Sequence, residues 1–271
     1  MLKKRLIFTL LYDNGFFMLS RNFRLQRVGD FSWLVKNYDF ARTATAIDEL
    51  IILNVQRDRR SDPDFIRHLQ QLCDLCFVPI TAGGGIRDVD SGAELLSNGA
   101  DKVLINTVAS ANPKVVFEIA ERFGQQSIVL GIDLQRFEGT IRPLVDYGRE
   151  TPTNSSISNY LEELTMLPVG EWYVNSVDRD GTGLGFDTDL LELLPPTRRQ
   201  PLILAGGASK PEHFQQVFND PRVSALATAH LFNFIGDGLQ NVRHFILRSG
   251  HELPRWDYEK IRRLDMRVMY D

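Results

Sequence analysis

Short apolar segments alternate with amphipathic segments along all 271 residues of the chain. A run of four to seven apolar residues between turn residues predicts a buried strand, and apolar residues three and four positions apart predict a helix. Strands are therefore expected at residues 5–11, 49–55, 78–81, 102–106, 127–133, 171–176, 201–205 and 225–229. Helices are expected at about residues 31–45, 62–73, 88–98, 113–123, 157–167, 188–194, 211–219 and 238–249.

This alternation predicts the fold class. Strands that each precede a helix, repeated eight times, favour a closed parallel barrel over an open sheet. The strand at 127–133 is almost continuously apolar, as expected for burial on both faces. No linker rich in proline, glycine or serine divides the chain, so we predict an α/β fold, a single-domain (βα)₈ or TIM barrel. The long polar connections at 12–29 and 135–155 are expected to lie over its mouth.

The amino-acid composition and net charge limit the kinds of binding partner that are expected. A hydrophobic content of 43% and a charged content of 24% are ordinary for a soluble globular protein. The net charge of −4 argues against sequence-independent binding to nucleic acid or to an anionic membrane. The basic and apolar start is interrupted by polar and turn residues at 12–15, so we interpret it as a first strand rather than a signal peptide. We predict a cytoplasmic protein without a nucleic acid or membrane partner.

Cys73 and Cys76 form a Cys-x-x-Cys motif, which could be a redox pair or half of a zinc site. The chain has only these two cysteines, and His68 is not at a zinc-finger spacing from them. We interpret both as packing cysteines at the end of a helix, and we expect no metal site and no cofactor.

A glycine-rich loop at 83–85 follows a short apolar strand and precedes a helix, and the next strand ends in Asn106 and Thr107. Glycines allow close approach of a ligand, and their N–H groups can face an anion. Both features fall at the carboxyl ends of predicted strands, where α/β folds bind ligands. The residues alone leave two interpretations open, a phosphate cradle or a turn that only tightens a connection.

The loop is repeated in the second half of the chain. Residues 82–86 are echoed by 205–208, and about twenty residues later each half has a strand that ends in small or polar residues. We predict a twofold half-barrel repeat with two anion sites on opposite sides of one mouth. Such a mouth suits a ligand that carries a phosphate at each end.

Five segments, at residues 82–87, 100–102, 105–107, 122–124 and 178–182, resemble the HisF family. Its members are the cyclase subunits of imidazole glycerol phosphate synthase. The resemblance extends from the start of the chain to about residue 250, so we predict a barrel at 1–250 and a C-terminal extension at 251–271. It implies a barrel that binds a HisH-like glutaminase subunit on its amino-terminal face. Ammonia then passes through the barrel to a phosphorylated small molecule at the mouth.

The resemblance also implies roles for single residues. Asp133, at the end of the fifth strand, matches one of two catalytic aspartates, although a capping or loop-bridging aspartate is the structural alternative. His230 could reach a phosphate or be structural, in a stretch at 225–232 with one residue more than the family pattern. The phosphate-binding candidates are Gly84, Gly85, Asn106, Thr107, Asp180, Gly181, Thr182, Gly206, Gly207 and Ala229.

The first catalytic aspartate of the family is absent, because its position is occupied by Leu11. Leucine cannot exchange a proton, and loss of one member of an acid–base pair typically costs about 10²–10⁴ in rate. A family lysine in the first loop likewise becomes Leu19, and the aspartate of the second strand becomes Asn54. Asp13 has the same side-chain parity as Leu11, but we expect it to lie in the loop, where it would not replace the missing carboxylate.

Residues matching the family's ammonia entrance are retained. Arg5, Glu49, Lys102 and Glu171 each begin a predicted strand, and two cations with two anions neutralise one another. The resemblance implies a gate for ammonia, and a ring that only stabilises the barrel is the alternative. Asp101 and Gln126 match positions on the glutaminase-docking face.

The contrast between retained and lost residues suggests a function. Our preferred hypothesis is a HisF-like subunit of a surface-polysaccharide pathway, acting with a glutaminase and a sugar amidotransferase to amidate a sugar. The first alternative is a true cyclase of histidine biosynthesis, and the second is a non-catalytic barrel that only activates a glutaminase. The aromatic stretch at 16–18 would be either a contact surface for a partner or ligand, or packing at the mouth.

Overall fold

The computed structural model describes residues 3–38, 40, 45–57, 63–152, 156–230 and 237–254 of the chain. Its parallel strands are β1 (Arg5–Asp13), β4 (Glu49–Asn54), β5 (Ile80–Gly83), β6 (Lys102–Ile105), β7 (Ile128–Phe137), β9 (Glu171–Ser176), β10 (Leu202–Ala205) and β11 (Ala225–Thr228). Its helices are α1 (Phe31–Asn37), α3 (Pro63–Leu75), α4 (Val89–Ser97), α5 (Thr107–Ala111), α6 (Lys114–Phe123), α7 (Ile157–Leu164), α8 (Pro211–Phe218) and α9 (Gly238–Arg248), with 3₁₀ turns η1 (Gln125–Ser127) and η2 (Thr188–Leu193).

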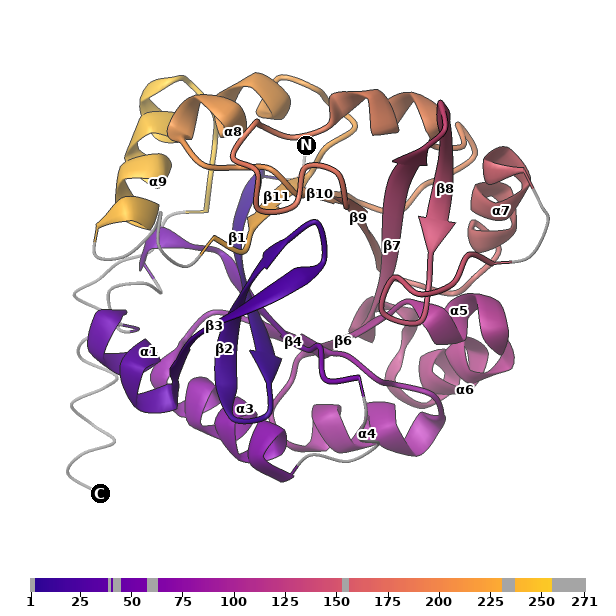
Figure 1. The fold of residues 1–271 in the computed structure, drawn as a ribbon, viewed down its shortest axis with the longest axis horizontal. Coiled ribbons are helices and arrows are strands. Elements are labelled where there is room, and N and C mark those ends of the chain that lie inside the picture. The colour runs from indigo at the N-terminus through magenta and orange to yellow at the C-terminus, as the bar shows by residue number, and fades with distance from the viewer. Residues whose placement is uncertain are drawn as a thin grey trace.

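The parallel strands close on themselves. Each pairs with the next in chain order, and β11 returns to pair with β1, where Arg5 lies opposite Ala225. Helices surround this cylinder (Figure 1). The predicted single-domain (βα)₈ barrel is therefore confirmed.

The two long connections form hairpins on the barrel. Strand β1 continues into an antiparallel hairpin of β2 (Phe16–Arg21) and β3 (Arg24–Asp30), and β7 pairs in the same way with β8 (Thr140–Leu144). Figure 1 shows the β2–β3 hairpin lying across the front of the barrel. The polar segments expected at the mouth are thus ordered hairpins.

Two predicted helices differ from the observed elements. The segment 188–194 forms the 3₁₀ turn η2, because Pro195 and Pro196 follow directly and the residue before a proline is disfavoured in the α conformation. The helix expected at 31–45 ends at Asn37, and 39 and 41–44 lie outside the described residues. Most of the predicted C-terminal extension, 255–271, also lies outside them.

The barrel interior and the surrounding shell form two separate apolar clusters. The larger one joins the outer faces of the strands to the helices. The smaller one fills the barrel with side chains from alternate strand positions, as the two-residue period of a strand requires. Its members are Ile7, Ile51, Leu104, Val129, Tyr173, Ile203, Ala205, Ala225 and Ala227.

The cysteines pack as predicted. Cys76 is buried, and the Cys73 thiol donates a hydrogen bond to the Gly99 carbonyl at 3.3 Å. Burial raises the pKa of each thiol to about 11, which keeps both protonated and unreactive near neutral pH. Within the described residues, no group of His, Cys, Asp and Glu is suited to hold a metal ion, and no helix is long and apolar enough to cross a membrane.

A buried ion pair fastens α9 to the start of the barrel. The Arg243 guanidinium lies 3.0 Å from the Asp48 carboxylate, and both side chains are at most 6% exposed. The other Asp48 oxygen accepts from the Leu6 N–H at 2.8 Å, and Arg243 also donates to the Pro254 carbonyl. The pair therefore connects α9, β1 and the segment that follows α9.

We expect Asp48→Ala to lower the free energy of unfolding by about 3–5 kcal/mol, because Arg243 would keep a buried charge without this carboxylate. Urea denaturation followed by circular dichroism measures the change. Asp64→Ala is the control, since Asp64 pairs with Arg67 on the surface and its loss should cost less than about 1 kcal/mol. Equal losses in the two variants would contradict the assignment.

Candidate functional site

A cavity of about 700 Å³ opens at the carboxyl ends of the barrel strands. Asp133 lines it, together with all of the predicted phosphate-binding residues except Thr182. The Thr182 hydroxyl instead donates to the Arg179 carbonyl at 2.7 Å, within its own turn. Closure of the barrel thus brings residues from both halves of the chain to one cavity, as the repeat predicted.

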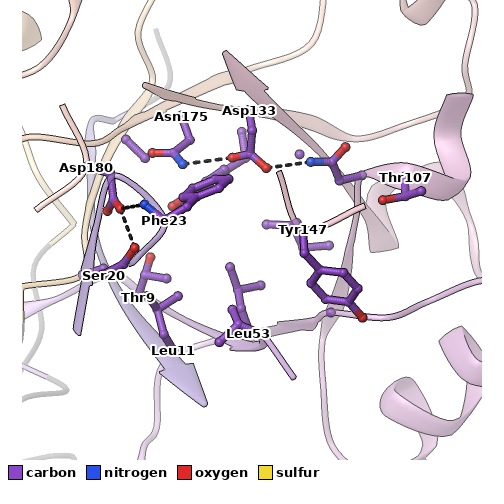
Figure 2. Close-up of a pocket in the computed structure, with 18 of the residues that line it drawn as sticks. Thr9, Leu11, Ser20, Phe23, Leu53, Thr107, Asp133, Tyr147, Asn175 and Asp180 are labelled. Atoms are coloured by element: carbon purple, nitrogen blue, oxygen red, sulfur yellow. Dashed lines mark hydrogen bonds between the residues drawn. The ribbon is translucent and has the colours of Figure 1, made fainter. Parts of the chain in front are cut away.

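Asp133 is held between two amides. Its carboxylate oxygens accept from Asn175 Nδ2 at 2.9 Å and from Asn106 Nδ2 at 2.7 Å (Figure 2). Burial raises the pKa of Asp133 to about 6, and the Asp180 charge adds to this, while both amide hydrogen bonds oppose it. A carboxyl group with a pKa near 6 can exchange protons at physiological pH.

The wall facing Asp133 across the cavity is apolar at the position where the resemblance implies a carboxylate. Figure 2 shows Leu11 and Leu53 there, with Thr9 deeper on the same strand as Leu11. Asp13 is not among the described residues that line the cavity. It pairs with Phe16 at the turn of the hairpin, and its carboxylate accepts from Asn14 Nδ2 at 2.8 Å.

The first glycine loop has a backbone that favours glycine. Gly84 has a φ of 101°, and a Cβ there would lie only 1.9 Å from the Asn54 carbonyl oxygen. Its counterparts Gly206 and Gly207 also have positive φ, 92° and 98°, so the two loops share the same left-handed conformation. The described residues thus show the twofold repeat in backbone shape as well as in sequence.

The tip of the β2–β3 hairpin is bound to the second glycine side of the cavity. Asp180 accepts from the Ser20 hydroxyl and from the Phe23 N–H at 3.1 Å, as Figure 2 shows. Asn22 adds backbone and side-chain hydrogen bonds to the Asp180 and Val177 carbonyls at 3.0 and 2.9 Å. Burial raises the pKa of Asp180 above its usual value, although the Ser20 and Phe23 hydrogen bonds oppose this.

Two loops meet above the cavity. A Cβ added at Gly148, in the turn after β8, would come 2.7 Å from the Phe23 ring, so this turn and the hairpin tip are in contact. We call the hairpin tip and the turn at 145–150 together the roof. Sequence reasoning placed loops at the mouth but missed Ser20, Phe23 and Tyr147 as lining residues, because their partners lie far along the chain.

Three other residues that were discussed for the mouth, Phe17, Leu19 and His230, differ in their surroundings. Phe17 is fully buried and its ring contacts those of Tyr12 and Phe31, which supports packing rather than a contact surface at 16–18. Leu19 packs against the outer core. Burial lowers the pKa of His230, which lines the cavity near Asp180, while residues 231 and 232 lie outside the described part.

A closed ring of ion pairs lies at the opposite end of the barrel. Arg5 is paired with Glu49 and Glu171, and Lys102 Nζ lies 3.1 Å from Glu49 and 2.5 Å from Glu171. Burial alone would raise the pKa of Glu171, but Arg5 and Lys102 hold it below its usual value. Each cation therefore contacts both anions, and the ring is neutral as a whole.

Asp101 and Gln126 lie at the same end of the barrel as the ring. The Asp101 carboxylate accepts from the Ile80 N–H at 2.7 Å, and Gln126 Nε2 donates to the Phe123 carbonyl at 3.3 Å. Both side chains are exposed next to the starts of their strands.

Comparisons with known proteins agree with this geometry. The family model described as "Histidine biosynthesis protein" matches residues 25–235. A protein of Parasynechococcus marenigrum (strain WH8102), provisionally named imidazole glycerol phosphate synthase subunit hisF2, is 45% identical over 94% of this chain and 95% of its own length. The HisF subunits of Thermotoga sp. (strain RQ2) and Streptococcus mutans are 33% and 34% identical, over 92% and 86% of this chain and 97% and 92% of their own lengths.

The chain belongs to the HisF family. The resemblance seen in the sequence motifs is thereby confirmed. Leu11, which the resemblance matches to the first catalytic aspartate, lines a mouth in which Asp133 has a raised pKa. The roles of the individual site residues stay predictions.

We expect the Asp133 carboxyl carbon to titrate with a midpoint near pH 6 in ¹³C NMR of aspartate-labelled protein. Asn175→Ala should raise that midpoint, because a hydrogen bond to the ionised form is lost. Asn159→Ala, an exposed amide on α7, should leave it unchanged. An unchanged midpoint in Asn175→Ala would contradict the role of this amide.

The raised pKa also predicts a pH dependence of stability. The folded-state pKa exceeds the unfolded value, so this contribution is fully present below about pH 4 and is lost as the pH rises through 6. Asp133→Asn removes the titration, and its stability relative to the wild type should improve by roughly 2–3 kcal/mol between pH 4 and pH 7. Denaturation at the two pH values measures this difference, and an equal difference at both would contradict it.

Proposed function

We propose that this chain is a HisF-like synthase subunit that receives ammonia from a glutaminase and delivers it to an acceptor other than the cyclase substrate. The observation that carries this proposal is the pairing of an intact Asp133 with an apolar wall at Leu11 and Leu53. Ring closure by two carboxylates needs a proton-exchanging group on both sides. Asp13 lines no part of the cavity in the described residues, so it offers no replacement.

The barrel axis is suited to carry neutral ammonia. The ion-pair ring at the strand starts is followed by an interior layer of aliphatic side chains together with Tyr173, and Asp133 lies beyond that layer. An apolar layer excludes the charged ammonium ion but admits neutral ammonia. The ring would then be the entrance, where charge compensation keeps four ionised groups stable in a partly buried place.

The amino-terminal end of the barrel offers a surface for a HisH-like glutaminase. Phe77 is 43% exposed and Met166 is 78% exposed, and both lie in segments that lead into strand starts. Asp101 and Gln126 lie at this same end. Exposed apolar side chains with polar neighbours are typical of protein interfaces.

For the acceptor, we infer a phosphorylated sugar derivative of surface-polysaccharide synthesis in the cytoplasm, with a sugar amidotransferase as a further partner. The two glycine loops support a phosphorylated ligand in the mouth. A true cyclase is the second candidate, favoured by the retained Asp133 and by the names of relatives such as the Thermotoga HisF subunit. A barrel that only activates a glutaminase would stimulate glutamine hydrolysis without transferring ammonia to any sugar.

We expect the gene for this chain not to rescue a histidine auxotroph that lacks the cyclase subunit, whereas the Thermotoga HisF relative should. With ammonia as the nitrogen source, the purified chain should convert the cyclase substrate at least about 10²-fold more slowly than that relative. Growth at the rate of the control strain would overturn the proposal. Transfer of ¹⁵N from glutamine to a sugar acceptor, measured with the glutaminase and amidotransferase of the same organism, would support it.

Met166→Asp should weaken binding of the glutaminase from the same organism at least tenfold, because a charge would be placed in an apolar contact. Leu184→Asp is the matched control: Leu184 is 68% exposed but follows β9, at the mouth end of the barrel. Isothermal titration calorimetry measures both affinities. A loss of affinity in Leu184→Asp with none in Met166→Asp would place the glutaminase on the other face.

A further inference from the structure

The turn after β8 is fixed to the first phosphate-site candidate. The Asp146 N–H donates to the Thr107 hydroxyl oxygen at 2.9 Å. Val145 and Glu150 close the turn with reciprocal backbone hydrogen bonds at 2.9 and 3.2 Å. The turn therefore cannot shift without breaking its contact with Thr107.

The backbone of this turn is strained. Asp146 and Tyr147 have φ values of 48° and 59°, so two successive residues with side chains adopt the left-handed conformation. A residue with a side chain persists in this conformation only where its surroundings enforce it. Strain of this kind is found most often at ligand sites and active sites.

The strained turn places the Tyr147 side chain above the glycine loop. A Cβ added at Gly85 would come 3.3 Å from the Tyr147 hydroxyl, and both residues line the cavity. Figure 2 shows the Tyr147 ring on the same side of the cavity as Thr107. The phenol group thus lies over the loop whose backbone would bind an anion.

The neighbouring side chains of Asn106 and Thr107 have different hydrogen-bond partners. The Asn106 amide donates to Asp133 and, at 3.5 Å, to the Leu144 carbonyl, so its side chain serves the carboxylate. The Thr107 oxygen accepts from Asp146, which leaves its own hydrogen free to turn toward a ligand. Arg149, on the same turn, lines the cavity together with Asp146 and Glu150, so the turn contributes one cation and two carboxylates to the mouth.

We propose that the Tyr147 hydroxyl is a phosphate-binding group, which donates to a terminal phosphate held by the glycine loop and the Thr107 hydroxyl. This inference rests on the proposed phosphate-binding function of the mouth. It assigns a phosphate monoester end of the ligand to the Gly85 side of the cavity. It also explains why a strained turn is held against Thr107.

The test is a titration with inorganic phosphate, followed by ¹H–¹⁵N NMR of the whole chain. Amide shifts of Gly84, Gly85 and Thr107 report the first site, and those of Gly206 and Gly207 report the second site in the same sample. Tyr147→Phe keeps the ring but removes the donor. We expect the dissociation constant of the first site to rise about tenfold, the effect of one hydrogen bond to a charged group, while that of the second site stays unchanged.

Tyr38→Phe is the control, because it removes the hydroxyl of a buried tyrosine just after α1 that does not line the cavity. It should leave both dissociation constants unchanged. Binding at the first site with equal affinity in Tyr147→Phe and wild type would overturn the role of Tyr147 and leave phosphate binding intact. Absence of shifts in both sets of amides in the wild type would instead overturn phosphate binding, and this inference with it.

Discussion

Pairing of β1 with β11 is the interaction on which the rest of the structure depends. Once the sheet is closed, alternate side chains of every strand must point into the barrel. On β1 these are Arg5, Ile7, Thr9 and Leu11, which lie in turn at the ion-pair ring, in the apolar layer and at the cavity. Strand β1 therefore contributes a side chain to the ion-pair ring, to the apolar layer and to the cavity wall. A change of its register by one residue would turn all of these side chains away from the barrel interior.

The ionisation of Asp133 at the mouth depends on opposing effects of its surroundings. Burial favours the neutral form of Asp133, and the amides of Asn106 and Asn175 favour the ionised form. With a second carboxylate at position 11, repulsion would be added to this balance, as it is in paired acids. Leu11 removes that repulsion, so the pKa of Asp133 is set here by burial first, then by the Asn175 amide, the Asp180 charge and the Asn106 amide. The wall opposite Asp133, at Leu11, therefore carries no proton-exchanging group.

The strands could be predicted from the sequence because their signals are local, whereas the ring was implied by the resemblance. A buried strand is visible as an apolar run, and charges at strand starts gather once the barrel closes. The glycine loops were equally visible, since glycine is required where Gly84 approaches the Asn54 carbonyl. The helix at 188–194 was predicted wrongly, because its apolar spacing is helical but the prolines after it stop an α-helix.

The roof could not be predicted. The hydrogen bond from Ser20 to Asp180 joins residues 160 positions apart, and no local pattern encodes which loop a hairpin tip will contact. The location of Tyr147 at the cavity could not be predicted either, because it depends on two residues with positive φ that are not glycine. The presence of Asp or Tyr in a turn does not by itself predict the left-handed conformation.

The contact between Phe23 and Gly148 joins loops that begin on opposite halves of the barrel, one after β1 and the other after β7 and β8. Residues of both loops also line the cavity that the two glycine loops share, so a movement of one hairpin would change the space left for a ligand beside the other. Loop movements of this kind set the rate of ligand release in many enzymes. The mouth of this barrel is therefore shaped by a contact between two hairpins as well as by the barrel strands.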